Sequence, residues 1–139
     1  KKYKKSAKNS VQTFLLWYNI PINWTNRGTS MFKVYQIQLT NAMIDKVNAE
    51  GFLSVPAMKV KMDLGLDREF TQDMFEHYEL VATCEAKDLE DVFEIGNIRH
   101  ERMNIIKQMH SVSVGDVIEN PEGKMFVVRN MGFDEIFVA

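Results

Sequence analysis

The chain has 139 residues, of which 45% are hydrophobic and 26% charged, a composition typical of a globular domain rather than a disordered or fibrous chain. Its single cysteine excludes a disulfide framework within the chain, and no apolar run approaches the roughly 18 residues that a membrane-spanning helix needs. The net charge of −2 hides an asymmetry: residues 1–30 carry six basic residues and no acid, whereas residues 31–139 carry 11 basic and 19 acidic residues.

The first 30 residues therefore form a basic leader with a charge of +6. It is either an arm that binds nucleic acid or another anionic surface, or a segment outside the domain, with Met31 as the true start. We favour the second interpretation, because a strand pattern begins directly after Met31. The sequence thus predicts a basic leader over residues 1–30 and a single domain over residues 31–139.

The domain begins with a predicted strand over residues 32–39, where successive side chains alternate between two faces. Thr40 is a good N-cap for a helix that runs to about Ala49, and Gly51 ends this helix. Three apolar residues of the helix have helical spacing: Met43, Ile44 and Val47.

Two weaker segments follow. Residues 54–64 have a proline near the start and a glycine after the end, which favours a helix, but their methionines and valine alternate as in a strand. We predict a helix. Residues 65–76 are expected to form an exposed connection, in which Thr71 caps one turn that brings Met74 and Phe75 onto the core.

Residues 78–86 alternate and predict a second strand. One of its faces is expected to hold Tyr78, Leu80, Ala82, Cys84 and Ala86. Asp88 then caps a predicted helix that runs to about Ile95 and is stopped by Gly96 and Asn97. Residues 98–109 are expected to form a short helix or an irregular lid.

The segment after residue 110 resembles a catalytic loop at first sight, but we interpret it as turn chemistry. Residues 120–123 have Asn, Pro and Gly at the positions that a type I turn favours. Strands are predicted over residues 117–118, 125–129 and 134–138. The expected turn residues are Ser111, Ser113, Gly115, Asn120, Pro121 and Gly123.

The element order β-α-α-β-α-β-β-β predicts a small α+β domain. We expect a mixed, mainly antiparallel sheet with a C-terminal β-meander and two to four short helices.

No catalytic residue is predicted. Ser113 lacks the Gly-x-Ser-x-Gly spacing of a hydrolase elbow, and one Gly-Asp pair at residues 115–116 does not make a phosphate loop. An enzyme with a cleft at the turn of residues 110–116, using Ser113, Asp116 and His110, remains an alternative.

We also expect no metal and no cofactor. The three histidines are scattered, with no His or Cys pair at ligand spacing, although a non-local site from His100, Glu101 and His110 remains conceivable. Cys84 lies on an apolar strand face, which is typical of a buried hydrophobic residue rather than a nucleophile.

Acidic residues gather on the predicted helix after residue 88. The simplest explanation is a solvated face, and it is also the candidate surface for a partner protein: Asp88, Glu90, Asp91 and Glu94, with Asp116 nearby. Duplex binding needs positive charge, whereas residues 31–139 carry −8. A local basic patch would have to come from Lys59, Lys61, Lys107, Lys124 and Arg129.

Three stretches of the second half resemble the YodL-like domain family. A strand leads into an acidic helix over residues 83–97, a Ser-x-Ser-Val-x-Asp-Val-Ile turn follows within residues 109–118, and a strand ending in Gly-Phe lies within residues 127–136. The resemblance covers about residues 78–136 and does not include the basic leader. It implies a product of a phage, plasmid or other mobile element, with no established activity and no catalytic residues.

The sequence thus favours a small, non-enzymatic phage or mobile-element protein, located in the cytoplasm of a bacterial host, that binds a host or phage protein through its acidic surface. The first alternative is a nucleic-acid-binding module with a hairpin like those of PUA and ASCH domains and a basic N-terminal arm. The second is the enzyme with a cleft at residues 110–116. No membrane association is expected.

Overall fold

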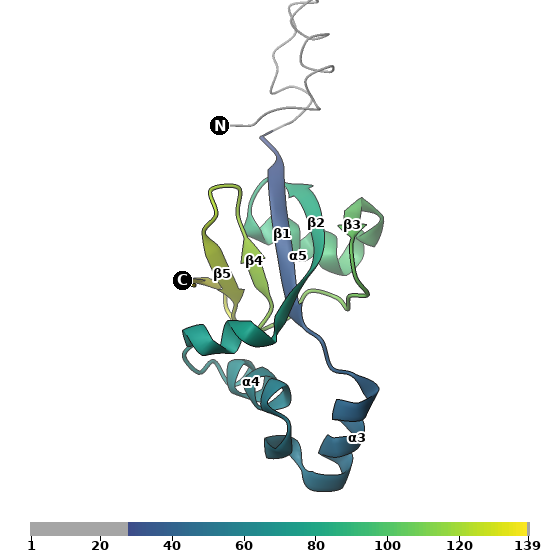
Figure 1. Cartoon of the computed structure of the whole chain (residues 1–139). Coiled ribbons are helices and arrows are strands. Elements are labelled where there is room, and N and C mark those ends of the chain that lie inside the picture. The colour runs from purple at the N-terminus through teal and green to yellow at the C-terminus, as the bar shows by residue number, and fades with distance from the viewer. Residues whose placement is uncertain (1–27, 139) are drawn as a thin grey trace, which may run out of the picture.

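The centre of the protein is a six-stranded sheet in the order β3-β2-β1-β4-β5-β6, seen in a computed structural model that describes residues 28–138 (Figure 1). Every pair of neighbouring strands is antiparallel. The strands are β1 (Ser30–Ile37), β2 (Tyr78–Ala86), β3 (Met103–Ile105), β4 (Val117–Glu119), β5 (Met125–Val128) and β6 (Phe133–Ile136). The predicted α+β class and the C-terminal meander are confirmed, and most of the basic leader lies outside the described residues.

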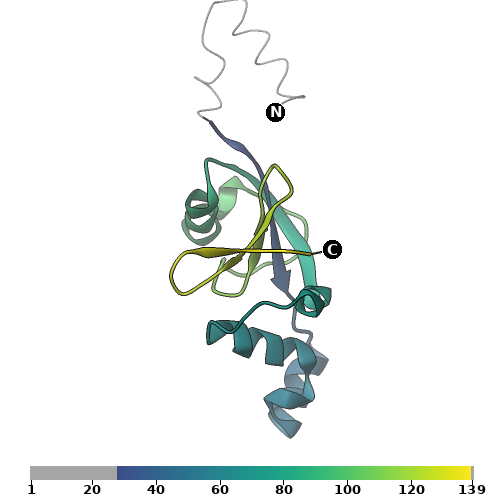
Figure 2. The same cartoon turned by 90° about the vertical axis from the view of Figure 1, so that its left-hand side faces the viewer.

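In the described part of the chain, the helices form two groups, each inserted between two consecutive strands. Four of them connect β1 to β2: α3 (Asn41–Glu50), η1 (Phe52–Ser54), α4 (Pro56–Gly65) and η2 (Gln72–His77). The other two connect β2 to β3: α5 (Leu89–Ile98) and η3 (His100–Arg102). The first group lies at one end of the sheet, with α3 farthest away, whereas α5 packs across a sheet face (Figures 1 and 2).

The apolar side chains form two core clusters, one on each face of the sheet. The first lies under α5 and comprises Phe32, Val34, Val81, Ala82, Cys84, Ala86, Val92, Ile95, Met103, Val112, Ile118 and Val128. The second lies under α4 and η2 and comprises Ile37, Val55, Ala57, Val60, Leu64, Tyr78, Val117, Val127 and Ile136. The strands β1, β2, β4 and β5 thus contribute buried residues to both clusters, whereas the edge strand β3 contributes only Met103, to the first cluster.

A β-bulge in β2 changes which side chains share a face. The register of β1 against β2 skips Val81, so Val81 and Ala82 both point into the first cluster, whereas Tyr78 belongs to the second. The predicted common face is therefore confirmed for Ala82, Cys84 and Ala86, which all belong to the first cluster, and was wrong for Tyr78 on the other side of the bulge. A regular period of two cannot reveal a bulge that inserts one extra residue.

The helices of the first insertion follow their local signals. Thr40 caps α3, its Oγ1 accepting a hydrogen bond from the Met43 amide at 3.1 Å, and the predicted helix over residues 54–64 is confirmed as α4. Thr71 is the N-cap of η2, which brings Phe75 between Tyr35 and Tyr78, at ring-centroid distances of 5.3 and 5.6 Å. However, α3 buries none of its side chains fully, so its apolar stripe is only partly covered.

The helix α5 does not stop at Gly96 but continues to Ile98. Gly96 is buried against Val112, and the Asn97 side chain donates hydrogen bonds to the carbonyl oxygens of Phe93 and Val112, at 2.7 and 3.0 Å. The glycine is thus a point of close approach rather than a stop signal. Residues 98–109 form η3 and the edge strand β3 instead of a lid.

We predict that Gly96→Ala destabilises the protein by about 1–3 kcal/mol. A Cβ atom at this position would lie 3.1 Å from the Val112 Cβ and would overlap its Cγ2. The overlap outweighs the gain of about 1 kcal/mol that alanine otherwise brings to a helix interior. Urea unfolding followed by circular dichroism measures the change.

Gly65→Ala is the matched control, because Gly65 ends α4 and no atom lies within 4 Å of the position that a Cβ atom would take there. It should leave the free energy of unfolding nearly unchanged. In a Val112→Ala background, Gly96→Ala should lower the free energy of unfolding much less, because the overlapping Cγ2 atom is gone. An equal cost in both backgrounds would show that the contact with Val112 is irrelevant.

Candidate functional site

A buried polar network joins β1 to the predicted turn. Gln36 is 0% and Asp116 is 3% exposed. The Gln36 Nε2 donates to the His110 carbonyl oxygen at 2.8 Å and to the Asp116 Oδ2 at 3.0 Å, and the Gln36 Oε1 accepts from the His110 amide at 3.2 Å. The Asp116 Oδ2 also accepts from the Ser113 amide at 2.9 Å. Both N–H donors of the Gln36 side chain and its oxygen are therefore used.

The network fastens the segment of residues 108–116 to the sheet. Gln38, two residues further along the chain from Gln36, donates to the Gln108 carbonyl oxygen at 2.6 Å. At the other end of the segment, the Tyr78 hydroxyl donates to the Gly115 carbonyl oxygen. These side chains position the start of β4 beside β1.

The predicted turn residues lie in the two turns on either side of β4. Asp116 accepts a hydrogen bond from the Ser113 amide three residues before it, and the hydroxyl groups of Ser111 and Ser113 make no hydrogen bond within the described residues. Gly115 has a φ of +95°, which favours glycine. In the second turn, the Asn120 Oδ1 accepts from the amides of Glu122 and Lys124, at 3.1 and 2.8 Å.

At the turn of residues 110–116, the cavity that the described residues form beside Asp116 has a volume of about 10 Å³, enough for about one water molecule and too small for a substrate. The His110 ring is directed to the Ser111 carbonyl oxygen, with its Nδ1 at 2.8 Å, rather than to Asp116 or Ser113. Burial raises the pKa of Asp116 to about 6, but its carboxyl group is enclosed by its own hydrogen-bond partners.

The acidic residues of α5 divide into two kinds. Asp88 caps the helix, its Oδ1 accepting from the Asp91 amide at 2.8 Å, and the Asp91 Oδ2 accepts from the Lys87 amide at 2.9 Å. Glu90 and Glu94 are exposed, and the only close cation within the described residues is Arg99, 4.0 Å from Glu94. The structure does not bring Asp116 to this surface, because its carboxylate is buried.

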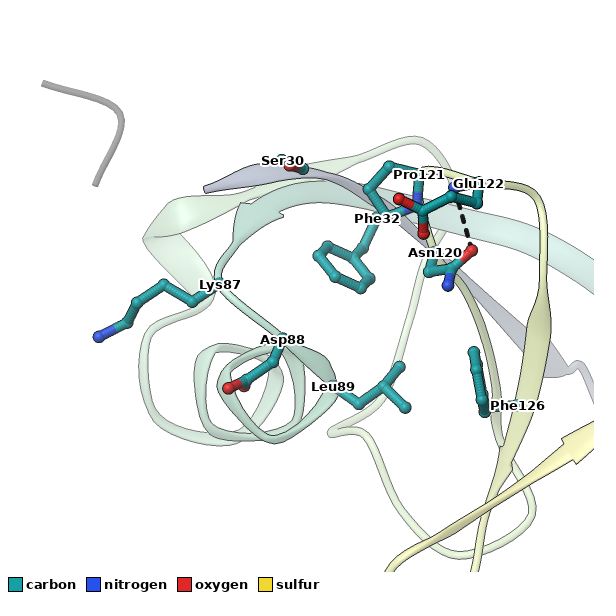
Figure 3. Close-up of a pocket in the computed structure, with 9 residues that line it drawn as sticks. All are labelled: Ser30, Phe32, Lys87, Asp88, Leu89, Asn120, Pro121, Glu122 and Phe126. Carbon is teal, nitrogen blue, oxygen red and sulfur yellow. Dashed lines mark hydrogen bonds between the residues drawn. The ribbon is translucent and has the colours of Figure 1, made fainter. Parts of the chain in front are cut away.

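A cleft of about 250 Å³ opens beside α5, between the start of the helix and the β4–β5 turn (Figure 3). Nine residues line it: Ser30, Phe32, Lys87, Asp88, Leu89, Asn120, Pro121, Glu122 and Phe126. Phe32, Leu89 and Phe126 surround its interior, whereas the Lys87 side chain extends away from it (Figure 3). Asp88 was the predicted contact residue among them, with Asn120 and Pro121 predicted as turn residues. No local pattern marks the cleft, because it combines separate segments of the chain.

The basic residues considered for a local patch come from several elements. Lys59 and Lys61 lie on α4, Lys107 follows β3, Lys124 precedes β5 and Arg129 follows it. Arg129 donates a hydrogen bond to the Arg68 carbonyl oxygen at 2.8 Å, and Arg68 pairs with Asp63 of α4, so Arg129 lies near α4, whereas Lys124 lies at the β4–β5 turn. Three of them form ion pairs with acids: Lys59 with Asp63, Lys107 with Glu79, and Arg129 with Asp134.

The structure also shows the surroundings of the candidate metal ligands and of the cysteine. Within residues 28–138, no group of three or more His, Cys, Asp and Glu side chains is arranged to hold a metal ion, and the His100 ring contacts the Gly96 carbonyl oxygen. Cys84 is buried, and burial raises the pKa of its thiol to about 11. In the same part of the chain, every helix is too short or too polar to cross a bilayer.

Comparison of the chain with protein-family models, with curated proteins and with solved structures finds no match.

We predict that Asp116 makes stability depend on pH. Its folded-state pKa of about 6 lies above the ordinary value of 3.8, so the folded protein retains this proton where the unfolded chain has released it. Through this group, lowering the pH from 7 to 4 should stabilise the fold by up to about 3 kcal/mol, and raising the pH through 6 removes that gain.

The Asp116→Asn variant is the comparison, because asparagine keeps an oxygen that accepts the same hydrogen bonds but does not titrate. The free energy of unfolding of each protein is measured at several pH values between 4 and 7. The difference between the two proteins should change over this range by up to about 3 kcal/mol. Parallel profiles across this range would mean that Asp116 titrates normally.

Proposed function

We propose that this chain is a small protein-binding module without catalytic activity, and that its contact surface is the exposed face of α5 together with the adjoining cleft. The observation that carries the proposal is the position of the cleft: it opens at the start of the helix whose carboxylates, Glu90 and Glu94, are exposed. A concave apolar site bordered by charge is the arrangement that protein interfaces use, with an apolar centre and a polar rim.

The dimensions of the cleft support a protein partner over a small-molecule substrate. Pockets for drug-sized ligands measure about 300–1,000 Å³, and this cleft, at about 250 Å³, lies below that range. In protein complexes, by contrast, one or two side chains in such a pocket carry much of the binding energy.

The charge of the domain supports a protein partner over a nucleic acid. Residues 31–139 carry −8, and Lys59, Lys107 and Arg129 are paired with acids, which disfavours binding to phosphate groups. The enzyme alternative needs a cleft at residues 110–116, and the described part of the chain forms there a cavity for about one water molecule, which does not support it. Binding of nucleic acid through the basic leader concerns residues outside the described part of the chain.

The proposed biological setting is a phage or another mobile element, with action in the cytoplasm of a bacterial host. This part of the proposal rests on the resemblance of residues 78–136 to the YodL-like domain family. The single buried cysteine fits a reducing compartment. A host or phage protein with a basic surface is the expected partner, because it would complement the carboxylates of α5.

We predict that the double substitution Glu90→Lys and Glu94→Lys abolishes partner capture while the protein stays folded. Both side chains are exposed, and the substitution retains the like-charge pair on the helix, so the loss of stability should stay within about 1 kcal/mol. The measurement is a pull-down from nuclease-treated bacterial lysate with the tagged 139-residue chain, checked by circular dichroism.

Glu50→Lys with Glu69→Lys is the matched control, since both acids are exposed and the change in net charge is the same. A partner held by the parent protein and by this control, but lost from the α5 variant, supports the proposal. Equal retention by all three proteins would exclude the α5 face as the contact surface. Release of the captured material by nuclease would instead indicate a nucleic-acid ligand.

A further inference from the structure

The cleft beside α5 has an apolar interior and a polar rim. Phe32 and Leu89 approach from the sheet and the helix, and Phe126 closes the side formed by β5 (Figure 3). Asn120 stands at the rim, and its Oδ1 is occupied by two backbone amides. Its Nδ2 has no partner within the described residues and is free to donate to a backbone carbonyl of a bound segment.

The charged groups at the rim favour a basic occupant. Asp88 and Glu122 both line the cleft, and Glu90 and Glu94 continue the negative surface along α5. Among the described residues, Lys87 is the one cation that lines the cleft, and its side chain extends away from it (Figure 3). A second copy of this chain is disfavoured, because a two-fold contact through this face would bring like charges together.

We infer that the cleft receives one aromatic or aliphatic side chain from a partner protein, and that lysine or arginine residues flanking that anchor pair with the carboxylates at the rim. This inference rests on the proposed function and specifies the chemistry of the partner: a basic segment with a single apolar anchor. The anchor displaces water from Phe32, Leu89 and Phe126, and the flanking cations set the orientation.

Three blocked pentapeptides test the two requirements separately. Lys-Ala-Phe-Ala-Lys has both the anchor and the cations, Lys-Ala-Ala-Ala-Lys lacks the anchor, and Glu-Ala-Phe-Ala-Glu reverses the charge. Dissociation constants are measured on the 139-residue chain from amide chemical shifts at low ionic strength. We expect the first peptide to shift residues that line the cleft, the second to bind roughly tenfold more weakly, and the third to bind undetectably.

Substitutions in the protein identify the cleft as the binding site. Ser30→Phe should fill it, because Ser30 lies on β1 two residues from Phe32 and shares its face, and should remove binding. Glu122→Gln should weaken binding several-fold, because it removes a carboxylate from the rim of the cleft. It should not disturb the fold, since the Glu122 side chain makes no hydrogen bond within the described residues. The control is Glu101→Gln, an exposed acid on η3 that does not line the cleft; it should bind like the parent.

Several results would overturn the inference. Equal affinity for the peptides with and without phenylalanine would exclude an anchor, and equal affinity for the acidic peptide would exclude charge complementarity. Binding that appears only after Lys1, Lys2, Lys4 and Lys5 are changed to Glu would assign the cleft to the chain's own leader. A different result would contradict the proposed function alone: the variant with Glu90→Lys and Glu94→Lys captures the partner as well as the parent protein does, while the peptides still bind in the cleft.

Discussion

The hydrogen bonds of the Gln36 side chain, one to the Asp116 carboxylate and two to the His110 backbone, are the interaction on which the second half of the fold depends. They tie β1 to the segment that precedes β4, and the side chains of Gln36 and Asp116 are both buried. A buried carboxylate or amide is costly unless it is hydrogen-bonded, so this pair strongly disfavours any other placement of the segment. Once β4 lies beside β1, the β4–β5 turn comes opposite the start of α5, and the cleft forms between them (Figure 3).

The acidic residues at the start of α5 that hold the fold differ from those that we propose contact a partner. Asp116, Asp88 and Asp91 each accept hydrogen bonds from backbone amides and hold the local structure, whereas Glu90 and Glu94 have no such role. Acids of the second kind are free to be used in binding without cost to the fold. The exposed residues Phe52 and Leu53 of η1 form a separate apolar surface near α3, at the opposite end of the molecule from the β4–β5 turn (Figure 1).

Several elements could be predicted from the sequence because their signals are local. The Thr40 cap, the proline at the start of α4, the alternation in β2 and the Asn-Pro-Glu-Gly turn each involve a few neighbouring residues. The predicted end of α5 was wrong, because Gly96 serves a contact with Val112, which is distant in the chain. The strand β3 was missed because its three residues depend on pairing with β2.

The sequence by itself determined the α+β class, most helices and strands, and the acidic character of α5, since propensity, capping and charge are properties of short stretches. The tertiary structure alone decided that Gln36 and Asp116 meet across 80 positions, that a bulge at Val81 divides β2 between two cores, and that residues from separate segments enclose a cleft. These features arise from contacts between distant residues, and no pattern within one segment encodes which distant residue will be the partner.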